Sequence, residues 1–204
     1  MRINLLTHSS IRMTDNNGRV FYFDPFNIKD EMHDADIIFV THDHFDHFSI
    51  KDINKISKPD TLYILPYSLK GKVNSNNVRY VKPFDRLEDI NVEVRPAYNI
   101  NKHFHPKNNE WVGYIIKIDN ELIYVVGDSD ALTENENVKV DILMVPIGGT
   151  YTMNVREASE FTNKIKPKAV IPTHYGSVVG SEKDAEAFKS LIDKSIEVRI
   201  IKEY

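Results

Sequence analysis

The 204-residue sequence contains no cysteine. This absence excludes disulfide bonds, thiolate nucleophiles and cysteine-ligated zinc, so any bound metal must be held by nitrogen and oxygen atoms. The sequence also lacks an apolar run of the roughly 20 residues that a membrane-spanning helix needs. Its first apolar stretch, residues 3–6, is too short for a signal peptide. We therefore expect a cytoplasmic protein that has no membrane partner.

The sequence has no large excess of charge of either sign, because the formal net charge is -4 and the isoelectric point is about 6.1. This gives no broad electrostatic reason to bind nucleic acid. Hydrophobic residues make up 41% of the chain and charged residues 27%, proportions typical of a globular protein. Since no linker rich in proline, glycine or serine interrupts the chain, we expect residues 1–204 to form a single domain. A small molecule is the expected partner, and a homo-oligomer is left open.

Short runs of β-branched, aromatic and aliphatic residues recur along the chain and predict strands. These runs cover residues 3–7, 20–24, 37–41, 62–65, 78–82, 92–96, 111–118, 122–126, 142–146, 169–172 and 198–201. Turn residues at 15–18 and 119–120 predict two hairpins, and we expect the first half of the chain to be mainly antiparallel. Amphipathic stretches predict helices that begin after Ser49, Asn154 and Ser181. This succession of elements indicates an α/β (α+β) fold in which helices cover layered sheets.

The strand predicted at residues 37–41 leads directly into the string His42-Asp43-His44-Phe45-Asp46-His47. A turn between this strand and the helix after Ser49 can direct several of these side chains toward one point. Imidazoles crowded together are costly to bury unless a cation or a carboxylate satisfies them. A solvated polar loop is the alternative, but an apolar strand directly before the string argues against it. We interpret the string as a site for zinc, with manganese or iron as alternatives.

His42, His44, Asp46 and His47 resemble the His-x-His-x-Asp-His motif of the metallo-β-lactamase superfamily. Further residues stand where this family places its later motifs: Asp24 before Pro25, Asp128 after Gly127, and His174 in Thr173-His174-Tyr175-Gly176. The resemblance implies a four-layer αββα sandwich. It also implies that His42 and His44 bind one metal ion, that Asp46, His47 and His174 bind a second, and that Asp128 bridges the two. Asp24 would orient a ligand histidine, with a simple turn as the alternative.

The sequence departs from the family pattern at Asn99, where many members have a third histidine ligand. Asparagine is a weak ligand for zinc, so Asn99, His103 and His105 all remain candidates for this position, and one ion remains as plausible as two. His105 is preferred over His103 because Pro106 stiffens its backbone. His8 stands where related small members place a histidine near the pocket, with a packed or exposed position as the alternative.

A divalent cation at this cluster would lower the pKa of bound water to about 7 and supply hydroxide as the nucleophile. We therefore predict a metal-dependent hydrolase in which Asp46 shuttles a proton and Asn99 or His105 orients the substrate. The chain resembles the branch that includes L-ascorbate 6-phosphate lactonases and many proteins of unassigned activity, and we expect a small anionic metabolite with a lactone, ester or phosphodiester bond. The alternative is a non-catalytic metal-binding sensor or redox module on the same fold.

Overall fold

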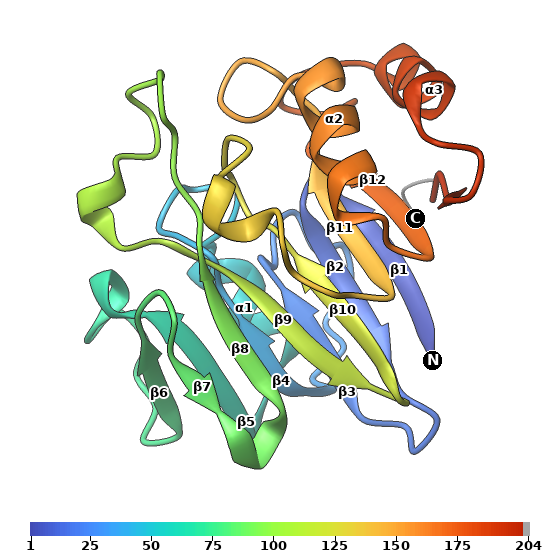
Figure 1. Ribbon diagram of the computed structural model, residues 1–204. Coiled ribbons are helices and arrows are strands. Elements are labelled where there is room, and N and C mark those ends of the chain that lie inside the picture. The colour runs from blue at the N-terminus through green and yellow to red at the C-terminus, as the bar shows by residue number, and fades with distance from the viewer. Residues whose placement is uncertain (202–204) are drawn as a thin grey trace.

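The computed structural model describes residues 1–201, in which two β-sheets pack face to face between layers of helices (Figure 1). The first sheet has the strand order β1-β2-β3-β4-β5-β6. Its strands are β1 (Arg2–Thr7), β2 (Ser10–Thr14), β3 (Val20–Phe23), β4 (Ala35–Phe39), β5 (Ser57–Pro66) and β6 (Val78–Val81). The second sheet has the order β13-β12-β11-β10-β9-β8-β7. Its strands are β7 (Arg86–Leu87), β8 (Val92–Pro96), β9 (Val112–Ile118), β10 (Glu121–Val125), β11 (Ile142–Pro146), β12 (Ala169–Thr173) and β13 (Glu197–Val198).

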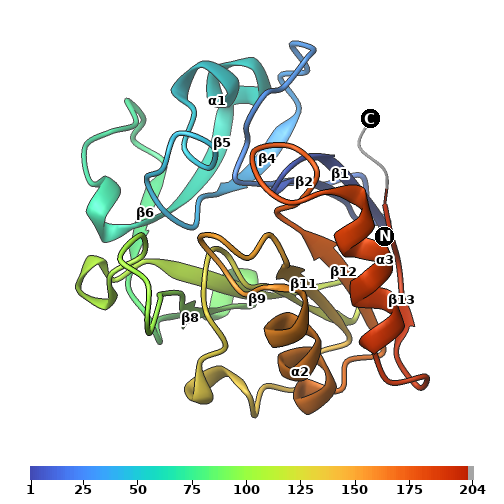
Figure 2. The same ribbon diagram turned by 90° about the horizontal axis from the view of Figure 1, so that it is seen from above.

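Helices cover the outer faces of both sheets. Helix α1 (Ile50–Ile56) packs on the first sheet, and α2 (Val155–Ile165) and α3 (Glu182–Leu191) pack on the second, beside β11 and β12 (Figure 2). Short 3-10 helices lie in the connections at Tyr67–Leu69, Glu88–Ile90, Lys107–Asn109 and Thr133–Asn135. These layers confirm the predicted αββα sandwich. Within residues 1–201, none of the helices combines the length and the apolar character needed to cross a bilayer.

The largest apolar cluster lies between the two sheets. Alternate residues of each strand point inward, as in Val92 and Val94 of β8. The rings of Phe23 and Phe39 stack with their centroids 4.6 Å apart. Tyr114 of β9 packs on both rings, and its hydroxyl donates a 2.6 Å hydrogen bond to the carbonyl oxygen of Val40. This bond joins the second sheet to the chain just after β4, where the histidine-rich string begins.

The strand pairing corrects one expectation about the first half of the chain. The pairs β1–β2, β2–β3 and β7–β8 are antiparallel, but β3–β4, β4–β5 and β5–β6 are parallel, so the first half is mixed rather than mainly antiparallel as expected. The reason is that residues 24–34 and α1 carry the chain back across the sheet before the next strand begins, as a parallel pair requires. Strands β2 and β7 were absent from the prediction, whereas both predicted hairpins are confirmed.

The predicted helix starts are also confirmed. Ser49 caps α1 by accepting from Asp52 N, and Asn154 forms a capping box with Glu157. Ser181 forms the corresponding box at the start of α3.

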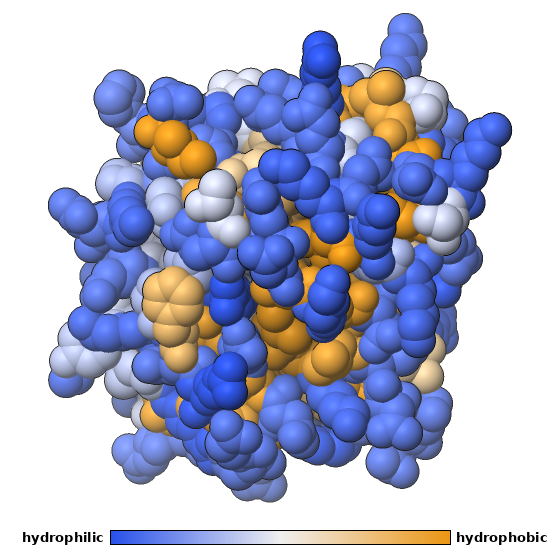
Figure 3. Space-filling model, viewed as in Figure 1, coloured by the Kyte–Doolittle hydropathy of each residue, from blue (hydrophilic) through white to orange (hydrophobic). Residues whose placement is uncertain are grey.

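Beside α2, Figure 3 shows apolar residues over β9 and β10. A surface groove of about 500 Å³ on this face includes Ile115 and Leu122 in its lining. None of the residues that line this groove belongs to the histidine-rich string.

Candidate metal centre

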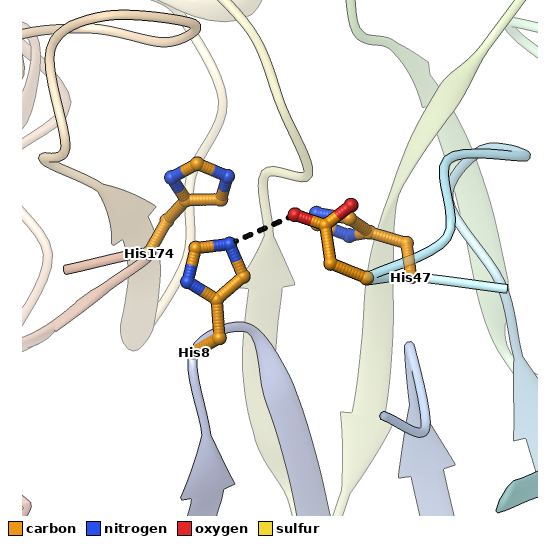
Figure 4. A group of neighbouring side chains, drawn as sticks. His8, His47 and His174 are labelled. Atoms are coloured by element: carbon orange, nitrogen blue, oxygen red, sulfur yellow. Dashed lines mark ion pairs between the residues drawn. The ribbon is translucent and has the colours of Figure 1, made fainter. Parts of the chain in front are cut away.

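The predicted site residues come together at one end of the sandwich, where strands of both sheets finish. The motif residues from His42 to His47 follow β4, and His8 lies in the tight turn between β1 and β2. The other members follow strands of the second sheet: Asn99 and His105 after β8, Asp128 after β10, and His174 after β12. Figure 4 shows His8, His47 and His174 approaching one another from three separate segments. The face-to-face packing of the two sheets therefore brings the site residues together.

Backbone hydrogen bonds shape the motif itself. Val40 N donates to Ile64 O, which keeps the chain extended just beyond β4. The amides of His47 and Phe48 then both donate to His44 O, at 3.0 and 2.8 Å. The chain thus changes from an extended segment to one helical turn within the motif. This change directs His42, on the extended side, and His47, on the turn, to the same buried point, where their ring centroids lie 4.0 Å apart.

Asp24 orients His47. Its buried carboxylate accepts hydrogen bonds from Thr41 N and Thr41 Oγ1, both at 2.7 Å, and lies 2.8 Å from His47 Nδ1. A carboxylate on Nδ1 favours the tautomer that carries the proton there, so Nε2 keeps its lone pair. That Nε2 atom lies 3.5 Å from Asp128 Oδ1. The geometry therefore supports an orienting role for Asp24 over a simple turn.

The structure places His105 in the cluster, while His103 is exposed. Asn99 accepts from the backbone amide of His105 at 3.1 Å, and its Oδ1 lies 3.0 Å from His105 Nδ1. His105 Nε2 then faces Asp128 Oδ2 at 3.3 Å. Asn99 is thus a neighbour that orients His105, and the imidazole of His105 occupies the place for which the sequence left three candidates.

Within residues 1–201, potential ligand atoms gather in three overlapping groups, with the atoms of each group within 4.8 Å of one another. The groups are His42, His44 and His105; His8, Asp46, His47 and His174; and His42, His47 and Asp128. Asp128 lies between the first two, because its Oδ2 is 3.3 Å from His105 Nε2 and 2.9 Å from His174 Nε2. The arrangement offers one site of three nitrogens and another of mixed nitrogen and oxygen donors.

Several of these potential ligand atoms are buried without a hydrogen-bond partner, as expected of atoms that bind a cation. Among the described residues, His47 Nε2, His105 Nε2 and Asp128 Oδ1 are buried and make no hydrogen bond. Buried polar atoms are almost always hydrogen-bonded, and several unsatisfied ones in one cluster need a common partner. Imidazole and carboxylate donors suit zinc, and also manganese and iron. The residues present therefore fit a metal centre.

The residues of the cluster differ in the direction in which their pKa values are shifted. Burial lowers the pKa of His47, but the carboxylates of Asp128 and Asp24 outweigh burial and hold this pKa well above its ordinary value. Burial, together with the neighbouring His47, lowers the pKa of His42 well below its ordinary value. Burial raises the pKa of Asp128, but the imidazoles of His174 and His47 outweigh it and hold this pKa well below the usual range. At neutral pH the metal-free centre thus combines an ionised Asp128 and a neutral His42 with a protonated His47, which would release its Nε2 proton when a cation binds.

Unusual backbone conformations occur at the centre. His8, Asp24 and His174 have φ angles of 51°, 45° and 58°, in the left-handed region that few residues other than glycine adopt. Such conformations persist where the surrounding structure demands them, and they are common at functional sites. A true glycine is required at position 148, because a Cβ there would lie 2.3 Å from His174 O. The close approach of Gly148 thus sets the position of His174.

The sequence left the position of His8 open and did not assign Trp111 to the centre. His8 Nε2 lies 3.3 Å from Asp46 Oδ2, the ion pair dashed in Figure 4, and its ring lies 3.9 Å from that of His174. Trp111 packs its ring 5.0 Å from His42 and 4.9 Å from His44. The location of His8 at the end of a predicted strand was a usable signal, whereas a buried tryptophan after a loop resembles any core residue.

Comparison with known proteins supports this view of the fold and the site. The family model described as "Beta-lactamase superfamily domain" matches residues 2–174, a range that ends at His174. A UPF0173 metal-dependent hydrolase of Caldivirga maquilingensis is 30% identical over 174 residues, which cover 80% of this chain and 74% of the relative. A UPF0173 protein of Pyrococcus furiosus is 32% identical over 194 residues, 89% of this chain and 86% of the relative.

A similar structure has also been solved. It is a candidate metal-dependent hydrolase of Parabacteroides distasonis, which is 30% identical and superposes with a TM-score of 0.84. The match covers 99% of this chain and 93% of the other. The structural match thus covers more of the chain than the family model, which ends at residue 174.

Proposed function

The chain belongs to the metallo-β-lactamase superfamily, and from this membership we propose that it is a hydrolase that cleaves a lactone, ester or phosphodiester bond of a small molecule with the help of one or two divalent metal ions. The observation that carries the proposal is the convergence of buried, unsatisfied imidazole and carboxylate atoms around Asp128. Metal-dependent hydrolysis is also the activity in the names of several curated relatives.

His42, His44 and His105 would hold one ion, and Asp46, His47 and His174, joined by His8, would hold the other, with Asp128 between them. Zinc is the expected ion, and manganese and iron are the alternatives. When bound, such an ion supplies Lewis acidity and makes hydroxide accessible at neutral pH. A second hydrogen-bonding layer, formed by Asp24 and Asn99, would keep the imidazoles in the required tautomer.

Proton transfer is the proposed task of Asp46. Burial raises the pKa of this carboxyl, but the hydrogen bond from His8 outweighs burial and lowers it below the ordinary value. Asp46 is therefore ionised at neutral pH and can accept a proton during the reaction. In the group of His42, His44 and His105, the half-buried His44 is the imidazole most open to solvent. A substrate would approach from this side.

The experiment combines elemental analysis with a hydrolysis assay on a panel of lactones, carboxylic esters and phosphodiesters. We expect wild-type protein to contain divalent metal and to turn over at least one substrate class. We expect Asp128→Ala to reduce turnover by at least about 100-fold, because it removes the carboxylate between both ligand groups. His33→Ala is the matched control, since His33 is exposed and lies outside the cluster within residues 1–201. Metal-loaded wild type that turns over none of the panel would refute hydrolysis and favour a binding role.

A further inference from the structure

Large apolar side chains are exposed on the loops that supply the metal centre. Phe45 is 69% exposed, Ile100 58%, Phe104 47% and Val178 40%. We call these four residues the apolar rim. Phe45 lies between two motif residues, Ile100 follows Asn99, Phe104 precedes His105, and Val178 follows His174 by four positions. Figure 2 looks onto the end of the sandwich at which these loops lie. Exposed apolar groups therefore accompany each of these loops.

Ring contacts hold two of these side chains beside the centre. Phe45 packs edge to face on Phe26, with centroids 5.8 Å apart. Phe104 packs in the same way on Tyr151 at 4.6 Å. The Tyr151 carbonyl oxygen in turn accepts from Asn99 Nδ2 at 2.9 Å. Tyr151 is thus connected to His105 through the side chain of Asn99.

Two segments beside the centre carry no charged side chain. Residues 147–154 and 174–181 contain no charged residue, although 27% of the whole chain is charged. Two lysines on the 97–107 segment already have partners. Lys102 Nζ lies 2.5 Å from Asp130 Oδ1, and Lys107 Nζ donates to Tyr98 OH at 3.2 Å. Asp43, in the motif itself, is exposed and acidic. These side chains favour a neutral ligand over the anionic metabolite expected from the sequence.

We propose that the apolar rim binds an uncharged apolar group of the substrate, an acyl or alkyl chain next to the scissile bond. This inference rests on the proposed function and specifies its substrate class. Apolar patches beside a few convergent polar groups are typical of ligand sites. The polar cluster would hold the reacting carbonyl or phosphoryl group, and the rim would cover the chain that is not altered by the reaction.

The test measures binding without turnover. A homologous series of linear primary amides, from acetamide to octanamide, is titrated into metal-loaded protein by calorimetry. Burial of one methylene is worth about 0.8 kcal/mol, roughly a fourfold change in affinity, so a half-buried chain should gain roughly twofold per methylene. We expect this gain to shrink in Phe104→Ser and in Val178→Ser. Leu191→Ser is the matched control, because Leu191 is 50% exposed on α3, away from the loops of the centre.

Equal affinity for acetamide and octanamide would overturn the inference, as would tighter binding of glycerol phosphate than of octanamide. The rim could instead contact a lipid surface or a second copy of the chain. Sedimentation with neutral phosphatidylcholine vesicles, or a dimer that Val178→Ser dissociates, would replace the inference if chain length has no effect on amide binding. Because amide binding requires no hydrolysis, a protein that binds octanamide but cleaves no substrate would refute the proposed function alone.

Discussion

Replacing Asp24 with asparagine tests whether the carboxylate behind His47 determines the metal affinity of the centre. Asparagine has nearly the same size and tolerates a left-handed backbone, so it suits the φ of 45° at this position. Its Oδ1 can still accept from Thr41 N. Its amide group, however, would donate toward His47 Nδ1, now 2.8 Å from a carboxylate oxygen. The imidazole proton would then move to Nε2, the atom that faces Asp128.

The expected decrease in metal affinity follows from the protonation of one ligand atom, Nε2 of His47. A protonated Nε2 has no lone pair to offer a cation. Changes to the partners behind ligand histidines typically reduce metal affinity by about 10–100-fold, which corresponds to about 1.4–2.7 kcal/mol. We expect a decrease in this range for zinc, with the overall fold retained, because the buried volume at Asp24 hardly changes.

The assay is a competition titration of zinc against a chromogenic chelator, accompanied by thermal unfolding. Asp34→Asn is the matched control. Asp34 also bonds side chains, Arg12 at 2.6 Å and Tyr22 at 2.9 Å, but it lies just before the start of β4, at the opposite end of this strand from the motif. The control should bind zinc like wild type. Wild-type zinc affinity in a folded Asp24→Asn protein would refute the assigned role of the carboxylate.

Three further changes probe the surroundings of the centre. Gly148→Ala should displace His174, because the new Cβ would lie 2.3 Å from its carbonyl oxygen; zinc stoichiometry measured on folded protein should fall, and an unchanged value would contradict the steric argument. Tyr114→Phe should lower the free energy of unfolding by about 1–2 kcal/mol, because the buried Val40 carbonyl loses its donor; denaturant unfolding measures this loss, and unaltered stability would count against it. In metal-free protein, burial lowers the pKa of His42. On acidification His42 is therefore protonated in the unfolded chain at a higher pH than in the folded protein, and the free energy of unfolding should decrease as the pH falls below about 6.5. The decrease should reach up to about 1.4 kcal/mol per pH unit for this group. Denaturant midpoints that stay constant or rise on acidification in this range would be incompatible with that shift.

The fold was largely predictable because its local signals agree with one another. The caps at Ser49, Asn154 and Ser181 mark the helix starts, and they depend on side chains within three residues of the cap. The parallel pairing of β3 with β4 was not predictable in the same way. Pairing is decided by contacts between strands distant in sequence, and a period-two pattern looks alike in both orientations. The short strand β2 was also missed, although Ile11 and Met13 alternate with polar residues.

By itself, the sequence determined which ligand atoms are available: the absence of cysteine left nitrogen and oxygen, and His42, His44, Asp46 and His47 marked one place where such atoms are concentrated. Only the tertiary structure placed His105 beside His42 and His44, left His103 exposed, and brought His8 close to Asp46, His47 and His174. The physical reason is distance along the chain. Spacing within a motif follows from local backbone geometry, but the approach of residue 105 or residue 8 to the motif depends on how two sheets pack, which no local pattern encodes.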